Sequence, residues 1–124
     1  MSVDVTRKIL LIDDDEDLRN LIAIYLKMAN YEIFHAVHGE DGKEQLKTLT
    51  PDLIIVDMMM PVLDGIGFLR WLQQEAKLEI PIIALTGRSK SDTQTTAQEL
   101  GATKVVFKPC DPEKIVEYAK EIIG

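Results

Sequence analysis

The chain has 124 residues, with 14 Lys and Arg against 21 Asp and Glu, so its formal net charge is −7. This length fits one domain, and the acidic balance disfavours nucleic acid as a partner. No apolar run approaches the ~20 residues of a membrane span, and no signal-like segment opens the chain. The single cysteine, Cys110, cannot form an internal disulfide. We therefore expect a cytoplasmic domain without membrane insertion.

Five short apolar runs recur along the chain, and each predicts a strand. The first, third and fourth have consecutive apolar residues without alternation, which is typical of strands buried on both faces of a parallel sheet. The runs are Lys8–Ile12, Tyr31–Ala36, Leu53–Val56, Pro81–Leu85 and Lys104–Phe107.

Segments with helical spacing separate these runs. The first follows Asp15 and has apolar residues at spacings of three and four. The last begins with Asp111 as an expected N-cap and Pro112 at the first helical position. The segment Ser91–Leu100 is almost entirely polar, which favours a weakly packed helix or an ordinary solvated one. The apolar positions of the first helix are Leu18, Leu21, Ile22, Tyr25 and Leu26, and further helices are expected over 39–49 and 65–76.

Strand and helix therefore alternate five times, which predicts a doubly wound α/β sandwich around a five-stranded parallel sheet. Right-handed crossovers place helices on both faces of such a sheet, and its functional crevice lies at the carboxyl ends of the strands.

Acidic residues follow the first strand directly. Five carboxylates in succession after a buried strand repel one another unless a cation or a helix N-terminus compensates them. We expect Asp13 and Asp14, nearest the strand, to bind Mg²⁺, which takes one or two protein carboxylates and keeps other positions for water and phosphate. For Asp15 to Asp17 we favour capping of the next helix.

Three later strand ends carry complementary groups. Asp57 follows the third strand, Thr86 the fourth and Lys108 the fifth. A carboxylate near a metal can act as a nucleophile toward phosphorus. A hydroxyl and an ammonium are the groups that would contact phosphoryl oxygens. Each alone is commonly a cap or surface residue, but together they predict a phosphoryl and metal site.

These motifs resemble the receiver domain of two-component response regulators over essentially the whole chain. The resemblance rests on the segments 9–15, 51–61 and 101–109, together with Asp64-Gly65 and Leu85-Thr86. It implies a flavodoxin-like, CheY-like sandwich with strand order 2-1-3-4-5.

The resemblance also implies a role for each site residue. Asp57 would be phosphorylated by the phosphohistidine of a sensor kinase or by a small phosphodonor, and Thr86 and Lys108 would contact the phosphoryl group. Asp14 and Asp57 would bind Mg²⁺ directly, Asp13 would bind it through water, and the backbone carbonyl of Met59 would add a ligand. The bond before Pro109 would be cis, as is plausible for a proline in a tight turn.

Three positions depart from the usual family pattern. The aromatic residue that receivers carry three positions before the lysine, as a switch that moves with Thr86, is here Val105. Phe107 shares the parity of Val105 along the strand, but we do not expect it to substitute. Met59 and Arg88 occupy the positions that line the approach of hydrolytic water. Because Met59 cannot orient water, we hypothesise slow self-dephosphorylation.

Three other functions compete with a phosphorylated receiver. A haloacid-dehalogenase-like phosphatase would use Asp13 and Asp15, but it leaves Asp57 unexplained. A flavin binder needs a phosphate loop rich in Ser, Thr and Gly where this chain has acids. A receiver that only docks a partner remains the third alternative.

The partners implied are a sensor histidine kinase or a histidine phosphotransfer protein, and a separate downstream effector, because we expect residues 1–124 to be one receiver domain without an output domain. Phosphorylation would change the surface formed by Ser91–Leu100, the fifth strand and the last helix. We expect a monomer, with transient dimers allowed, and no enzyme activity beyond Mg²⁺-dependent self-phosphorylation and slow self-dephosphorylation.

Overall fold

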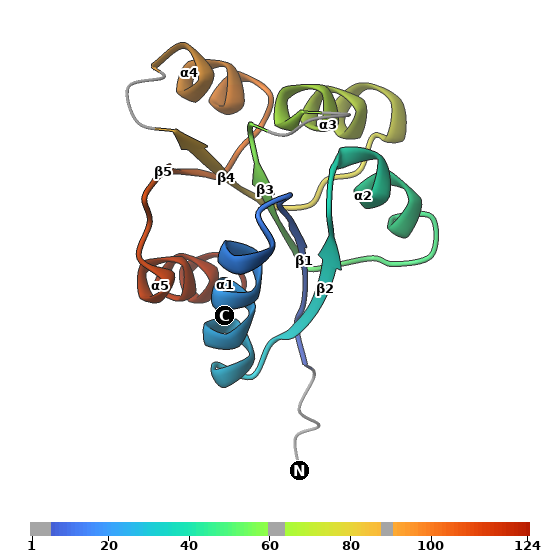
Figure 1. Cartoon of the computed structure of the whole chain (residues 1–124). Helices are drawn as coiled ribbons and strands as arrows, with labels where there is room; N and C mark the ends of the chain where they lie inside the picture. Colours follow the sequence, from blue (N-terminus) through green and yellow to red (C-terminus); the bar gives the residue numbers. More distant parts are fainter. Residues whose placement is uncertain (1–5, 60–63, 88–90) are drawn as a thin grey trace.

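The computed structural model describes residues 6–59, 64–87 and 91–124, with residues 91–94 described by their backbone alone. Five strands form a single sheet with the order β2-β1-β3-β4-β5, and every neighbouring pair is parallel. Figure 1 shows the sheet at the centre of the molecule. This topology confirms the predicted fold class and strand order. The strands are β1 (Lys8–Ile12), β2 (Glu32–Ala36), β3 (Leu53–Asp57), β4 (Ile82–Gly87) and β5 (Lys104–Lys108).

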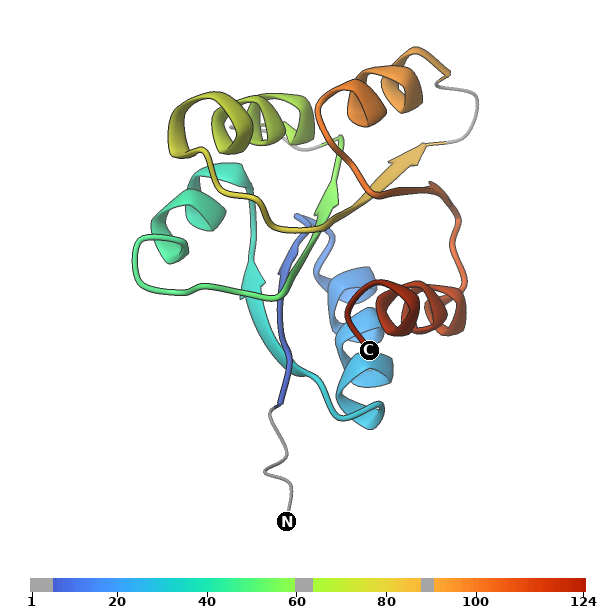
Figure 2. The ribbon, with the colours of Figure 1, turned by 180° about the vertical axis from the view of Figure 1, so that it is seen from behind.

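Helices cover both faces of the sheet. Two views related by a half-turn place α1 and α5 on one face and α2, α3 and α4 on the other (Figures 1 and 2). The second helix ends earlier than predicted, and the expected helix over 65–76 divides into an α-helix and a π-helical turn, η1. The bounds are α1 (Glu16–Met28), α2 (Gly39–Gln45), α3 (Gly65–Trp71), η1 (Leu72–Ala76), α4 (Ser91–Glu99) and α5 (Pro112–Ile123).

The sheet separates two buried hydrophobic clusters. In β1, Ile9 and Leu11 pack toward α1 and α5, whereas Leu10 and Ile12 pack toward α2, α3 and α4. Every residue of β3 is buried. Because side chains alternate between faces and both faces are covered, these strands need consecutive apolar residues. Within the described ranges, none of the helices is both long and apolar enough to span a bilayer.

Side-chain caps fix where the helices begin. Asp15 caps α1 by accepting a hydrogen bond from the Leu18 N–H, and Asp111 caps α5 by accepting one from the Glu113 N–H. Each cap satisfies a backbone N–H at the helix start that has no partner inside the helix. Pro112 is the first residue of α5, as predicted. The helix starts therefore stand directly beside the strand ends at which the site forms.

One prediction about α1 is wrong. Leu21, expected to face the core, is 44% exposed. The buried face of α1 instead carries Arg19, Ile22, Ala23 and Leu26, at the helical spacings of three, four and seven. The inward face of α1 therefore includes a charged residue. The helix is rotated about its axis relative to the orientation predicted from its apolar residues.

Gly65 is required where α3 begins. Its N–H donates to the Met58 carbonyl oxygen at 3.3 Å. A Cβ atom at Gly65 would lie 2.5 Å from the Met58 Cα and 2.7 Å from the Asp57 carbonyl oxygen. Both contacts are with backbone, which cannot move aside as a flexible side chain would. Only glycine allows α3 to pass this close to the end of β3.

We predict that Gly65→Ala lowers the free energy of unfolding by about 2–3 kcal/mol, the usual cost of overpacking a rigid site. Gly87→Ala is the matched control, because a Cβ atom at Gly87 would meet nothing within 4 Å, and its effect is expected to stay within about 0.5 kcal/mol. Urea unfolding monitored by circular dichroism measures both. Equal stabilities for the two variants would contradict this close approach.

Candidate functional site

The carboxyl ends of four strands bring the predicted site residues together. Asp13 directly follows β1, Asp57 ends β3, Thr86 is the penultimate residue of β4, and Lys108 ends β5. Because the strands are parallel, these ends meet at one edge of the sheet. Asp14, one residue beyond Asp13, completes the group.

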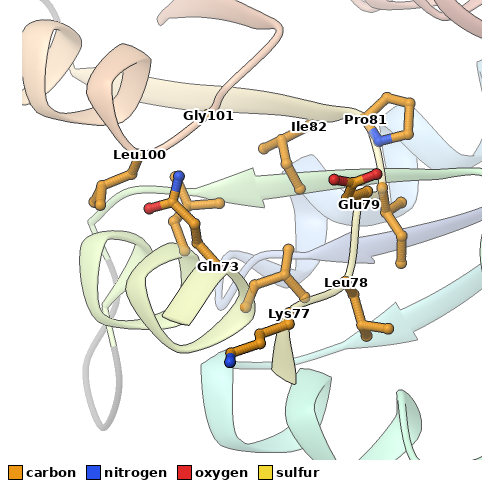
Figure 3. A pocket seen from close by; sticks show the side chains of 11 residues that line it. Gln73, Lys77, Leu78, Glu79, Pro81, Ile82, Leu100 and Gly101 are labelled. Atoms are coloured by element: carbon orange, nitrogen blue, oxygen red, sulfur yellow. The ribbon is translucent and has the colours of Figure 1, made fainter. Parts of the chain in front are cut away.

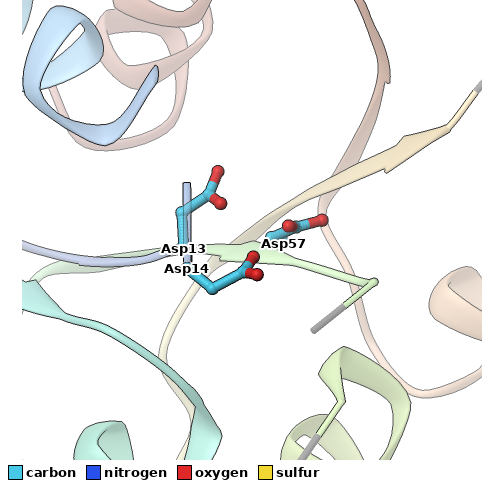
Figure 4. Close-up of side chains that lie close together, drawn as sticks. All are labelled: Asp13, Asp14 and Asp57. Carbon is cyan, nitrogen blue, oxygen red and sulfur yellow. The ribbon is translucent and has the colours of Figure 1, made fainter. Parts of the chain in front are cut away.

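Three carboxylates form the acidic part of this group, which we call the acid cluster: Asp13, Asp14 and Asp57. One oxygen from each lies within 4.8 Å of one oxygen from the other two, and Figure 4 shows their side chains gathered beside the end of β3. Asp13 is fully buried and Asp57 is 2% exposed, whereas Asp14 is exposed. The cluster therefore opens to solvent on the side of Asp14.

Backbone groups hold the two buried carboxylates. The Met59 N–H donates to Oδ1 of Asp57 at 3.0 Å, and the Asp15 N–H donates to Oδ1 of Asp13 at 2.9 Å. In each case the donor lies two residues after the aspartate that accepts the hydrogen bond. The loop that follows each strand therefore fixes the carboxylate at the end of that strand. The second oxygen of each carboxylate faces the shared space.

Lys108 supplies a single positive charge to this space. Its Nζ lies 3.1 Å from Oδ2 of Asp57 and 3.6 Å from Oδ2 of Asp13. Burial lowers the pKa of Lys108, but the Asp57 and Asp13 carboxylates more than offset this and hold the pKa above its ordinary value. Burial, opposed by the Asp15 N–H and reinforced by Asp57, raises the pKa of Asp13 to about 6. Within the described ranges, three acids thus share one ammonium, and negative charge remains in excess.

Thr86 adds an unpartnered hydroxyl at the same edge. Its side chain is fully buried, and among the described residues its Oγ1 has no hydrogen-bond partner. In the β3–β4 pairing Asp57 lies opposite Leu85, the residue before Thr86. Since buried hydroxyl groups are almost always paired, Thr86 is suited to a ligand that brings an oxygen into this space.

The donor set of the acid cluster fits Mg²⁺. Mg²⁺ is a hard cation that takes carboxylate oxygens from one or two side chains and completes its shell with water and phosphate oxygens. The excess negative charge, the raised pKa of Asp13 and the exposed Asp14 are the features that a divalent cation would compensate. Asp14 and Asp57 are the residues that would hold it directly.

A comparison with protein families agrees with this geometry. The family model of the response regulator receiver domain matches residues 9–120. The chain belongs to the response regulator receiver domain family. Receiver domains carry phosphorelay signalling in two-component systems, and they bind Mg²⁺ at an acidic pocket of this kind. The phosphatase and flavin-binding alternatives are thereby excluded.

Curated relatives match nearly all of this receiver domain. The alkaline phosphatase synthesis transcriptional regulatory protein PhoP of Bacillus subtilis is 34% identical over 119 residues, which are 96% of this chain and 49% of PhoP. The phosphate regulon transcriptional regulatory protein PhoB of Pseudomonas aeruginosa is 34% identical over 120 residues, 96% of this chain and 52% of PhoB. The chain therefore spans about half the length of these relatives.

Solved structures share the fold. The Vibrio cholerae chemotaxis protein CheY4 superposes with a TM-score of 0.88 at 26% identity, covering 96% of this chain and all of that one. A putative response regulator from Chloroflexus aurantiacus gives a TM-score of 0.88 at 28% identity, covering 95% of this chain and 98% of that one.

Of the residues expected to modulate the receiver site, the structure describes Met59 and Val105 as well as Thr86. Met59 is 57% exposed. Val105 is half-buried and packs against the hydrophobic cluster on the side of the sheet that α2, α3 and α4 cover. Phe107, on the same face of β5, is 38% exposed and does not fill the core. Arg88 lies outside the described residues.

Pro109 and Cys110 follow Lys108 along the chain. The Lys108–Pro109 peptide bond is cis. Cys110 is half-buried, and burial raises the pKa of its thiol. A raised pKa disfavours the thiolate, which is the reactive form of cysteine.

Sequence reasoning missed two residues beneath the acid cluster. Arg19 is buried, and its guanidinium contacts both the Asp13 carbonyl oxygen and the imidazole of His35. The spacing of Arg19 from Ile22, Ala23 and Leu26 is the signal that places it on the buried face of α1. No local signal identifies His35 as its partner, because the two residues meet only when β2 pairs with β1.

A separate cavity of about 460 Å³ lies away from these residues. It opens between η1, the start of β4 and the end of α4, and Figure 3 shows Gln73, Ile82 and Leu100 among the side chains that line it. It lies at the amino end of β4, opposite the acid cluster, and none of the site residues lines it. The cavity is therefore not part of the receiver site.

We predict that Asp13 makes the stability of the metal-free protein depend on pH. Its folded pKa of about 6 exceeds the ~3.9 of an ordinary aspartate, so the folded state binds this proton more tightly. The contribution of Asp13 to the free energy of unfolding therefore falls as pH rises from about 4 to about 7, by on the order of 2 kcal/mol. Urea unfolding in the presence of a chelator at several pH values measures the change.

Asp13→Asn is the variant that isolates this effect. Asparagine keeps an oxygen that accepts from the Asp15 N–H but removes the charge. The free energy of unfolding of the variant is therefore expected not to fall between pH 4 and pH 7, and to exceed that of the wild type at pH 7. If the free energies of unfolding of the two proteins depend on pH in the same way, Asp13 is not the cause of the pH dependence.

Proposed function

We propose that this receiver domain accepts a phosphoryl group on Asp57 in a Mg²⁺-dependent reaction. The observation that carries the proposal is the position of the Asp57 carboxylate. It is buried at the end of a central strand, has Lys108 3.1 Å away, and shares the acid cluster with Asp13 and Asp14. Asp57 is the residue that both the metal ligands and the cationic group surround.

The transfer forms one bond and breaks one bond. A carboxylate oxygen of Asp57 bonds to the phosphorus of the donor, while the bond between phosphorus and the donor atom breaks and its electron pair leaves with the donor. With a phosphohistidine donor the leaving group is the imidazole. Asp14 and Asp57 would hold Mg²⁺, which would supply Lewis-acid stabilisation of the phosphoryl charge. The product is an acyl phosphate on Asp57.

Lys108 and Thr86 are placed to receive the new group. Phosphorylation adds roughly two negative charges at a point where Nζ of Lys108 already contacts the carboxylate. The buried Oγ1 of Thr86, which has no partner among the described residues, can donate to a phosphoryl oxygen. Both contacts are made only when the phosphoryl group is present, so they favour a different arrangement of β4 and β5.

We place the output surface on α4, β5 and α5. Of the α4 side chains that the structure describes, only Ala97 is buried, and Val105 stands where the family usually has an aromatic switch. We therefore infer that α4 shifts when Thr86 is drawn toward the site. The partners are a histidine kinase or phosphotransfer protein and a separate effector. The monomeric state and the cytoplasmic location are parts of this proposal.

Incubation with acetyl phosphate tests the acceptor directly. With Mg²⁺ we predict a phosphorylated protein with one hydroxylamine-labile phosphate, detected by mass spectrometry, and with a chelator we predict none. Asp57→Asn is expected to abolish the label because an amide cannot form the acyl phosphate.

Asp52→Asn is the matched control, since Asp52 lies beside the opposite end of β3 and accepts a bond from the Lys8 N–H. It is expected to be labelled as the wild type is. A label that persists in Asp57→Asn would place the acceptor elsewhere, and an unlabelled wild type would favour the docking-only alternative.

We further predict a long-lived acyl phosphate. Met59 is exposed beside Asp57, and its thioether cannot hold a water for attack on phosphorus. Met59→Asn introduces an amide that can, so it is expected to shorten the lifetime severalfold when phosphate release is followed after removal of the donor. A wild-type half-life of seconds would contradict the proposal.

A further inference from the structure

Arg19 is a buried cation directly beneath the acid cluster. It is 8% exposed, although it lies in the second turn of a surface helix. Its Nη1 donates to the carbonyl oxygen of Asp13 at 2.7 Å, and its Nε donates to Nδ1 of His35 at 3.1 Å. Among the residues that the structure describes, no carboxylate pairs with it at 4 Å or less. Because an unpaired buried charge is costly, its retention calls for a reason beyond packing.

The Asp13 carbonyl belongs to the peptide that joins Asp13 to Asp14. This peptide therefore sets the direction in which both carboxylates leave the end of β1. On the other side of Asp13, its N–H donates to the Ala36 carbonyl oxygen of β2 at 3.1 Å. Hydrogen bonds therefore hold both backbone groups of Asp13, the residue that directly follows β1: its N–H is bonded to β2 and its carbonyl to Arg19.

His35 aligns the guanidinium from β2. Burial, followed by the positive charges of Arg19 and Lys27, lowers the pKa of His35. A neutral imidazole can accept at Nδ1, whereas the imidazolium has no acceptor. The position of His35 is itself fixed by α2, since the Gln45 side chain donates to the His35 carbonyl oxygen and to Oδ1 of Asp41. A continuous polar chain therefore runs from α2 to the acid cluster.

We propose that Arg19, aligned by His35, is a positioning residue of the metal site, which holds the Asp13–Asp14 peptide so that both carboxylates converge on a divalent cation. The inference rests on the proposed function of the acid cluster as a Mg²⁺ site. It differs from a purely structural role because it requires Arg19 to affect metal affinity and not only stability.

The test measures Mg²⁺ binding and Mg²⁺ dependence separately from folding. Arg19→Met keeps the apolar stem and removes the guanidinium, and we expect it to weaken Mg²⁺ binding roughly 10- to 100-fold by isothermal titration calorimetry, as removal of other groups that orient metal ligands does. The Mg²⁺ concentration that half-saturates phosphorylation by acetyl phosphate should rise in parallel. The rate at saturating Mg²⁺ should stay near that of the wild type, because Arg19 does not touch the phosphoryl group.

Arg70→Met is the matched control, because Arg70 is an exposed cation on α3, and it is expected to leave Mg²⁺ binding unchanged. Arg19→Lys keeps the charge but not the guanidinium fork, and His35→Leu removes only the aligning acceptor. Both are expected to weaken Mg²⁺ binding less than Arg19→Met does. These milder variants carry the test if Arg19→Met does not fold.

The outcomes separate this inference from the proposed function. A lower urea midpoint in the Arg19 and His35 variants with unchanged Mg²⁺ affinity would overturn the positioning role and leave the receiver site intact. A wild-type protein that binds no Mg²⁺ would overturn both. Weaker Mg²⁺ binding in these variants, with Arg70→Met unaffected, would support the inference.

Discussion

Three carboxylates face one ammonium at the carboxyl end of the sheet, and the surrounding structure is arranged to hold this imbalance of charge. Asp13 and Asp57 are removed from water, where a carboxylate is costly without compensation, and Lys108 reaches both of them without neutralising the group. The hydrogen-bonded parallel pairing of β1 with β3, supported by helices on both faces, keeps these acids together. A fold that buries continuous apolar strands thus places acids where a cation and a phosphoryl group are needed.

The groups left incomplete at this edge are those that the proposed ligands complete. Oγ1 of Thr86 has no partner within the described part of the chain, and the acids retain excess charge. A phosphoryl group would give the Thr86 hydroxyl an acceptor, and Mg²⁺ would compensate the excess negative charge of the acids. We propose that the structural response passes through the packing beside β4 and β5. There the contacts are small: Ala97 is buried against the sheet and Val105 is half-buried near it. Val105 stands where the family usually has an aromatic switch, so we do not expect the usual aromatic movement to report phosphorylation here.

The fold follows from patterns that act locally. Consecutive apolar residues in β1, β3 and β4 report burial on both faces, and Asp111-Pro112 marks the start of α5, so these features are predictable. The four strand ends are predictable as well, because parallel strands must bring them to one edge. Other features depend on contacts between distant segments. Leu21 is exposed because Arg19 takes a place on the inward face of α1, and that place is stable only once β2 brings His35 beside it. The π-helical turn at η1 likewise has no local sequence signal.

The central claim is that the acid cluster holds Mg²⁺ and that Asp57 accepts the phosphoryl group beside it. A crystal structure of the protein with Mg²⁺ and beryllofluoride, a mimic of the phosphoryl group, tests both parts in one measurement. We predict beryllofluoride on the Asp57 carboxylate, in contact with Thr86 Oγ1 and Lys108 Nζ, and Mg²⁺ bound by Asp14 and Asp57. Beryllofluoride on another residue, or Mg²⁺ away from the acid cluster, would contradict it.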